Sequence, residues 1–234
     1  MSGARDAILG GIRRALRRGA LPEATVAGLA ERVAAHRRNL IPARAAALDP
    51  AGRVDLFVAM AEEVQTTVVR VADGAAVPAE VARYLAAENL PAELVMAPDP
   101  GLDAIPWDTR PLLRLRRGRA EAADAVSVTP CLAAIAETGT LMLVSGSETP
   151  TTLNFLPDTH IVVLRAGQVV ASYEDGCDLV RAREEMPRTI NLITGPSRTG
   201  DIEQRIQLGA HGPRRLHIVL IDAPEASANA PPAA

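Results

Sequence analysis

The sequence predicts an α/β protein in which a mostly parallel sheet is flanked by helices and preceded by a helical appendage. Its 234 residues are 48% hydrophobic, which is enough for one large core. Helical periodicity alternates with short apolar runs over residues 50–97, which is the rhythm of βαβ units. Further apolar runs of strand length follow as far as residue 222.

Residues 1–45 form the predicted appendage, which contains two helices separated near Gly19 to Pro22. The first helix is amphipathic, because its apolar positions recur at helical spacing and four arginines fall largely on another face. The apolar positions are Ile8, Ile12 and Leu16, and the arginines are Arg13, Arg14, Arg17 and Arg18. This arginine face is either simply solvated or a docking surface for an acidic partner.

The α/β domain is expected to span residues 46–223, and residues 224–234, which have no core-forming content, are expected to be disordered. In the first half of the domain we predict, in order, a helix carrying Leu56, Phe57, Met60 and Val64, a strand in 66–71, a helix over 77–87, a strand in 92–97 and a peripheral strand in 112–117. In the second half we predict strands in 124–129 and 139–146, a hairpin over 160–170 that turns at Ala166 and Gly167, a helix over 174–184, and two buried strands in 189–195 and 214–222.

Composition excludes several classes of chemistry. All 25 basic residues are arginine, so a Schiff-base lysine, a pyridoxal-phosphate anchor and a P-loop lysine are absent. The two cysteines, Cys131 and Cys177, cannot build an iron–sulfur cluster or a structural zinc site from this chain alone, and we predict no metal site. A net charge of −3 and an aromatic content of 2% argue against nucleic-acid binding. No apolar run approaches membrane-helix length and no signal peptide is evident, so a soluble cytoplasmic protein is expected.

The segment Ile193 to Pro213 is the first candidate site. We predict that Gly195 and Pro196 end a strand and that Ser197 and Thr199 cap a helix, whose free N–H groups face an anion. The expected helix would bury Ile202 and Ile206 and end at Gly209. Arg198 adds a two-pronged donor for a carboxylate or phosphate, whereas Asp201 and Glu203 would repel an anion. A purely structural turn is the alternative.

The second candidate is the stretch around Glu137, followed by Thr138, Gly139 and Thr140 ahead of an apolar strand. A carboxylate at a strand edge can act as general base or nucleophile. Alternatively, Glu137 only binds loop amides and Gly139 supplies an unusual backbone angle. His160, at the start of a strand, and His211, in a loop, are further ligand-binding candidates, although a lone histidine often only hydrogen-bonds its loop.

Three linked motifs carry a family resemblance over residues 122–222. The stretches "AIAETGTLMLVS", "LNFLPDTHIVVL" and "ITGPSRTGDIEQRIQLGAHGPRRLHIVLID", in this order and spacing, resemble the LUD-domain proteins, and in particular the lactate utilization protein C subgroup. The resemblance implies a fold similar to the superfamily of ribose-5-phosphate isomerase and CoA transferases. It also implies a role in oxidising L-lactate to pyruvate beside partner proteins that hold iron–sulfur clusters, with no cofactor in this chain.

The resemblance covers the candidate residues but assigns no individual roles. The hypothesis that follows places a pocket between Glu137–Thr140 and the turn at 195–203, with Arg198, Ser197 and Thr199 binding an anion and Glu137 supplying the acid or base. Two alternatives stay open. One is a stand-alone enzyme acting on a small phosphorylated or CoA-linked substrate, and the other is a non-catalytic interaction protein that docks through its basic N-terminal helices.

Overall fold

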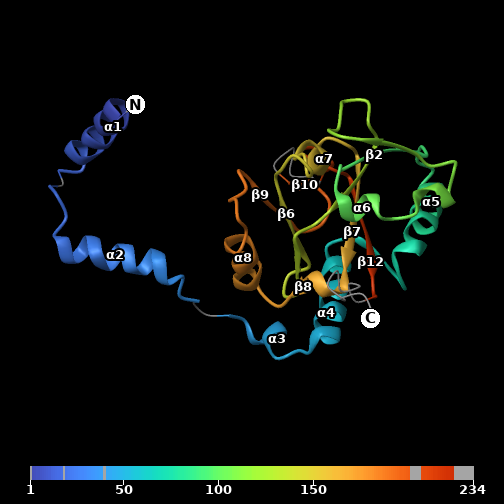
Figure 1. The fold of residues 1–234 in the computed structure, drawn as a ribbon, viewed down its shortest axis with the longest axis horizontal. Coiled ribbons are helices and arrows are strands. Elements are labelled where there is room, and N and C mark those ends of the chain that lie inside the picture. The colour runs from blue at the N-terminus through green and yellow to red at the C-terminus, as the bar shows by residue number, and fades with distance from the viewer. Residues whose placement is uncertain (1, 18, 39–40, 201–206, 224–234) are drawn as a thin grey trace, which may run out of the picture. The chain divides into compact units, whose positions relative to one another are not determined.

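A computed structural model describes the chain except for residues 1, 18, 39–40, 201–206 and 224–234 (Figure 1). The expected disordered tail, 224–234, therefore lies outside the described residues. Contacts divide the chain into two compact units, Met1–Leu40 and Ile41–Ala234. The predicted domain limits at residues 45 and 223 remain predictions.

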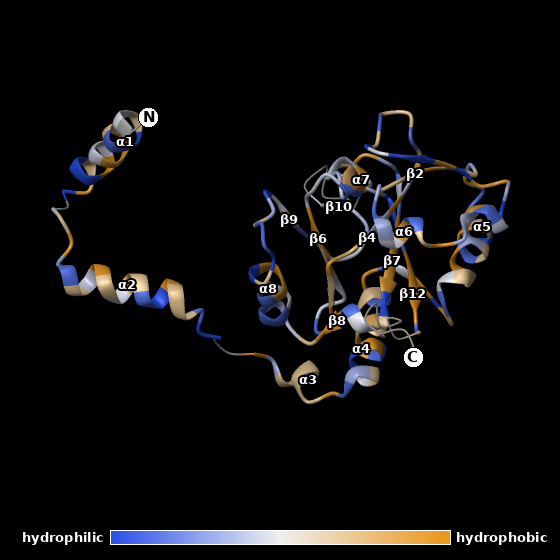
Figure 2. Ribbon diagram, in the orientation of Figure 1, coloured by the Kyte–Doolittle hydropathy of each residue, from blue (hydrophilic) through white to orange (hydrophobic). Residues whose placement is uncertain are grey.

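The first unit consists of helices α1 (Ser2–Ala15) and α2 (Glu23–Ala35), as the sequence predicted. None of the described residues from 3 to 38 is buried. Five large apolar side chains of the two helices are exposed, from 45% at Leu29 to 72% at Val33, namely Ile8, Ile12, Val26, Leu29 and Val33. Figure 2 shows hydrophobic and hydrophilic segments alternating along α1 and α2.

The second unit is built on a six-stranded sheet whose pairings are all parallel. Its order is β1-β12-β7-β4-β2-β3. The strands are β1 (Thr67–Val71), β2 (Glu93–Met96), β3 (Arg114–Arg117), β4 (Val126–Pro130), β7 (Thr159–Arg165) and β12 (Arg215–Ile221). The sequence thus predicted the fold class correctly, and β3 is the peripheral strand that its alternating arginines indicated.

Helices and short turns connect these strands. The helices are α3 (Ala43–Ala46), α4 (Pro50–Glu63), α5 (Val77–Ala87), α6 (Pro100–Asp103), α7 (Thr152–Phe155) and α8 (Tyr173–Arg181), and the 3₁₀ turns are η1 (Gly74–Ala76), η2 (Trp107–Thr109) and η3 (Ala166–Gln168). The helix predicted over 77–87 has those bounds in the structure. No described helix is long and apolar enough to cross a membrane.

A second, four-stranded sheet has the order β8-β5-β6-β9. It contains β5 (Ala133–Ile135), β6 (Thr140–Val144), β8 (Val169–Val170) and β9 (Ile190–Ile193). The alanine-rich β5 was not predicted, because alanine is depleted in strands and gives no strand signal. The strand β9 was predicted to be buried, but it is an edge strand whose residues are exposed or half-buried.

The hairpin predicted over residues 160–170 is wrong. The chain does turn at Ala166 and Gly167, but β7 and β8 belong to different sheets. Both edges of β7 are already paired, with β12 and β4, so β8 has no free edge there. Instead, Gln168 accepts a hydrogen bond from the Arg165 N–H and donates to the Cys131 carbonyl, and β8 pairs with β5.

Three apolar clusters hold the layers together. One face of the parallel sheet packs with α5, and the other packs with α4 and the second sheet. The outer face of the second sheet packs against α8 through Ile135, Met142 and Val180. Figure 1 shows α5 and α8 on opposite sides of the domain, and Figure 2 shows β6, β7 and β12 as strongly hydrophobic strands between them.

Candidate functional site

The expected helix after Ser197 is not present in the described residues. Arg198–Thr199 form a short strand, β10, that pairs antiparallel with β11 (Gln207–Leu208), so no helix begins directly after Ser197, and residues 201–206, on which most of the expected helix falls, lie outside the described residues. Gly195 and Gly209 adopt φ of +81° and +79°, and a β-carbon at Gly195 would lie 2.7 Å from the Val64 carbonyl oxygen. The capping residues favoured a helix, but the chain turns at Gly195 and Gly209 and β10 pairs with β11, so the segment folds back on itself.

Two expected site residues lie outside the described part of the chain, and the structure gives a third, Ser197, a different set of partners. Asp201 and Glu203, with the apolar positions Ile202 and Ile206, fall in 201–206, outside the described residues. The Ser197 hydroxyl accepts a hydrogen bond from the His211 N–H at 3.3 Å, and the Ser197 N–H donates to the Pro213 carbonyl at 2.8 Å. Ser197 therefore joins the turn to the loop that carries His211.

A cavity of about 370 Å³ lies beside this turn. Four of the predicted residues line it, namely His160, Ser197, Arg198 and His211. The remaining wall includes Asn154, Phe155, Leu192, Thr194 and Leu216. We call this the turn cavity. The structure thus gathers residues that are separated by about fifty positions in the sequence, because β7 and β12 are neighbours in the parallel sheet.

Arg198 supplies positive charge at the edge of the turn cavity. Its guanidinium donates to the Val64 carbonyl at the end of α4, and this bond fixes the side chain. A guanidinium has five N–H donors, so further donors are available to a carboxylate. Arg198 therefore presents guanidinium donors at this cavity, and its predicted role in binding an anion remains a prediction.

His160 is fully buried behind the turn cavity. One ring nitrogen, Nε2, lies 2.7 Å from the Thr129 hydroxyl, while Nδ1 has no partner among the described residues. Burial lowers the pKa of the His160 imidazole to about 3, because a charged ring would lose its hydration. His160 is therefore neutral near pH 7 and can serve as a hydrogen-bonding group in the wall.

The Glu137–Thr140 loop packs on α4 and does not line the cavity. Gly139 has a φ of +64°, and a β-carbon there would lie 2.4 Å from the Ala61 nitrogen. The Thr140 hydroxyl contacts three other hydroxyls, those of Thr138 at 2.7 Å, Tyr173 at 2.9 Å and Thr194 at 2.7 Å. Since Thr194 lines the turn cavity, this hydroxyl network connects the two predicted stretches.

Glu137 itself is buried, and its backbone N–H donates to the Ala171 carbonyl at 3.3 Å. Its Oε2 atom has no partner among the described residues. Glu137 lines neither this cavity nor the larger one described next. The expectation that Gly139 supplies an unusual backbone angle is therefore confirmed, whereas a direct contact between Glu137 and a ligand in either cavity has no support.

A larger cavity of about 650 Å³ was not predicted. It lies where β2, β4 and β7 end, and its wall contains Asp99–Leu102 after β2, Thr129–Leu132 at the end of β4, and Arg165 at the end of β7. The outer wall comes from residues 145–149, after β6, and from 183–188, after α8. We call this the strand-end cavity. Arg165 closes the apolar run "HIVVLR", and this is the one sequence signal that could have indicated it.

The two cavities share a wall. Asn154 lines both of them. Thr129 and His160 are hydrogen-bonded to each other, and Thr129 lines the strand-end cavity while His160 lines the turn cavity. In the described part of the chain, no group of three or more His, Cys, Asp or Glu side chains could hold a metal ion. Cys131 is buried, and burial raises the pKa of its thiol to about 12.

Comparisons with known proteins converge on one family. A family profile described as "LUD domain" matches residues 54–221. Lactate utilization protein C of Deinococcus radiodurans is 37% identical over 108 residues, which cover 46% of this chain and 50% of the relative. Lactate utilization protein C of Bacillus subtilis is 32% identical over 107 residues, which cover 44% of each protein. The match thus spans half or less of these relatives.

A solved structure supports the fold. The crystal structure of a DUF162 family protein from Deinococcus radiodurans matches with a TM-score of 0.58 and 28% identity. The match covers 74% of this chain and 99% of that chain.

Proposed function

Because the chain belongs to the LUD domain family, we propose that it is a component of an L-lactate utilization system and binds a small organic acid in the turn cavity. The names of the curated relatives support the lactate role. The observation that carries the binding role is the arrangement of Arg198, Ser197 and His211 around a cavity of about 370 Å³. This volume lies near the lower end of the range for small-molecule sites, which is roughly 300–1,000 Å³.

The chemistry of L-lactate fits the groups in this wall. A carboxylate is bound well by a guanidinium, here that of Arg198. The hydroxyl of lactate can donate a hydrogen bond to the imidazole of His211, which is exposed at the cavity. The imidazole can also accept the proton of this hydroxyl. The methyl group can pack against the side chains of Phe155 and Leu192.

Oxidation of L-lactate to pyruvate releases two electrons and two protons, so an electron acceptor is required. With two cysteines, this chain does not provide the thiolates of an iron–sulfur cluster. We therefore assign the electrons to partner proteins that hold iron–sulfur clusters. This chain contributes the binding and orientation of the acid, and Glu137 supports the loop that anchors Thr140 and does not contact the substrate.

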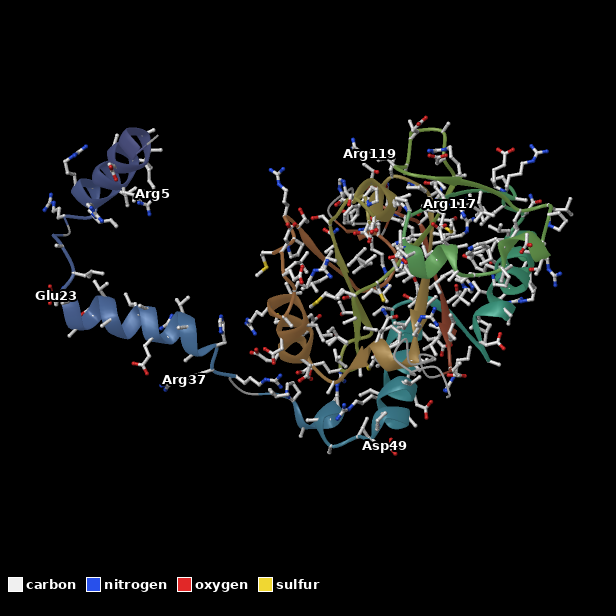
Figure 3. The ribbon with its side chains drawn as sticks, in the orientation of Figure 1. Arg5, Glu23, Arg37, Asp49, Arg117 and Arg119 are labelled. Atoms are coloured by element: carbon white, nitrogen blue, oxygen red, sulfur yellow. The ribbon has the colours of Figure 1, made fainter. Side chains whose placement is uncertain are left out.

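Titration of the pure protein with L-lactate tests the binding role. We expect saturable binding that Arg198→Gln weakens by about tenfold, which corresponds to the loss of one charge-assisted contact. Arg119→Gln is the matched control, because Arg119 is exposed, lines neither cavity and lies beyond β3 (Figure 3). Equal affinity of the wild type and both variants would refute the assignment of the site.

A native pull-down from the organism grown on L-lactate tests the partner role. Retention of cysteine-rich iron–sulfur proteins in stoichiometric amounts, identified by mass spectrometry, is the expected result. A protein that emerges alone would refute an obligate subunit role.

A further inference from the structure

We propose that the strand-end cavity is a second ligand site that takes an organic phosphate, and this inference does not depend on the lactate role. The proposal rests on three independent features of the cavity. These are its position in the sheet, the arginines that converge on it, and a buried asparagine in its wall.

The strand-end cavity lies where a parallel sheet leaves an open crevice. After β2 the chain turns outward through α6 to β3, at the edge of the sheet. After β4 it leaves in the other direction, through β5 and β6, and returns to β7 on the opposite side of β4. The two connections diverge above neighbouring strand ends, and ligands of open α/β sheets bind in such crevices. Residues 99–102, in the connection after β2, and residues 129–132, where β4 ends and its connection begins, line the cavity.

Three arginines from three parts of the fold line this crevice. Arg165 ends β7 and is half-buried, Arg183 follows α8, and Arg188 precedes β9. None of them forms an ion pair with another described residue, whereas Arg70, which lines no cavity, pairs with two carboxylates. One arginine suffices for a monocarboxylate, but a phosphate group carries up to two charges and three acceptor oxygens. Three unpaired guanidinium groups therefore fit a phosphate better than a carboxylate.

Three carboxylates also line the cavity, and they restrict which phosphate fits. Asp99 accepts a hydrogen bond from the Leu102 N–H, and so caps α6. Glu148 and Glu185 are exposed and form no ion pair with another described residue. They would repel a bare phosphate ion, but they can accept hydrogen bonds from hydroxyl or amino groups of a larger ligand. The cavity therefore favours a phosphate ester with a polar organic part over inorganic phosphate.

Asn154 points to a ligand independently of the charges. This residue is 4% exposed and lines the strand-end cavity. A side-chain amide carries both donors and an acceptor, so it can hydrogen-bond a polar ligand in the cavity.

Titration with defined probes tests the proposal. Adenosine 5′-monophosphate and glycerol 3-phosphate are the probes, and adenosine, glycerol and inorganic phosphate are the comparators, all at constant ionic strength. We expect saturable binding and thermal stabilisation by at least one of the two esters, and weaker binding of the comparators. Arg165→Gln and Arg183→Gln should each weaken this binding by about tenfold. Arg183 is exposed, so Arg183→Gln retains the fold even if Arg165→Gln does not.

Arg119→Gln and Arg198→Gln are the controls, because neither residue lines the strand-end cavity, and both should bind the ester as the wild type does. Absence of saturable binding of both esters below about 10 mM would overturn the proposal. Equal binding of inorganic phosphate and the esters, or binding unchanged by Arg183→Gln, would also overturn it. A variant that loses ester binding but keeps lactate binding, or the reverse, shows that this site and the turn cavity bind their ligands independently.

Discussion

The loop that carries Glu137 should depend strongly on Gly139. Replacement of Gly139 by alanine places a β-carbon 2.4 Å from the Ala61 nitrogen and 2.6 Å from the Met60 carbonyl carbon. Both are backbone atoms of α4, so no side chain can rotate away. The φ of +64° adds the left-handed penalty of about 1–2 kcal/mol, and overpacking adds about 1–3 kcal/mol. We therefore expect Gly139→Ala to lower the free energy of unfolding by about 2–5 kcal/mol.

Variants at two other glycines separate the contribution of backbone strain from that of overpacking. Gly118 has a φ of +130° but nothing within 4 Å of a β-carbon, so Gly118→Ala reports backbone strain alone. Gly167 has neither feature, and Gly167→Ala should be neutral or stabilising by up to about 1 kcal/mol. Urea denaturation of the three variants measures the differences. If Gly139→Ala costs no more than Gly118→Ala, the close packing of this loop on α4 is refuted.

Four further predictions concern the buried polar groups and the N-terminal helices. Burial lowers the pKa of His160 to about 3 and that of His217 to about 4, so between pH 6.5 and pH 4 the unfolded chain binds more protons than the folded chain. Stability should be complete above pH 6.5 and fall by roughly 1 kcal/mol per histidine for each pH unit below it, and urea midpoints that do not change from pH 7 to pH 4 would contradict this. Thr140→Val should cost about 1–3 kcal/mol in urea denaturation, because three hydroxyls lose their common partner, and a neutral effect would argue against the network. Glu137→Gln should leave the affinity for L-lactate unchanged in calorimetric titration, and a tenfold loss would restore Glu137 to the site. Removal of residues 1–40 should leave the thermal midpoint of the remaining chain unchanged, since none of the described residues 3–38 is buried, and a clear decrease would show that the two units stabilise each other.

The fold could be predicted wherever local pattern and burial agree. The helix at 77–87 begins with a proline in its first turn and buries one face through Val81 and Leu85, so periodicity alone located it. The hairpin predicted at 160–170 failed because strand pairing is decided by neighbours distant in sequence, which here already occupy both edges of β7. At the two ends of the helix expected after Ser197 the structure has the paired strands β10 and β11, a pairing between residues that are not adjacent in the sequence, and residues 201–206 between them lie outside the described part of the chain.

The candidate site was predicted in part. His160, Ser197, Arg198 and His211 were chosen because of their chemistry, and the structure brings them to one cavity. Glu137 was chosen on the same basis, but the turn at Gly139 directs its loop against α4.

The strand-end cavity could not be predicted, because it exists only where segments that are distant in the sequence meet. Arg165 is marked in the sequence only as the end of an apolar run, Arg183 and Arg188 carry no signal, and only the strand order and the position of α8 bring the three to one crevice.

The most direct test of the lactate role is growth of the organism on L-lactate as sole carbon source after removal of this chain. Growth should be lost, and it should be restored by the wild-type chain and by Arg119→Gln but not by Arg198→Gln. Normal growth without the chain would contradict the proposed function. Full restoration by Arg198→Gln would contradict the assignment of the turn cavity as the lactate site.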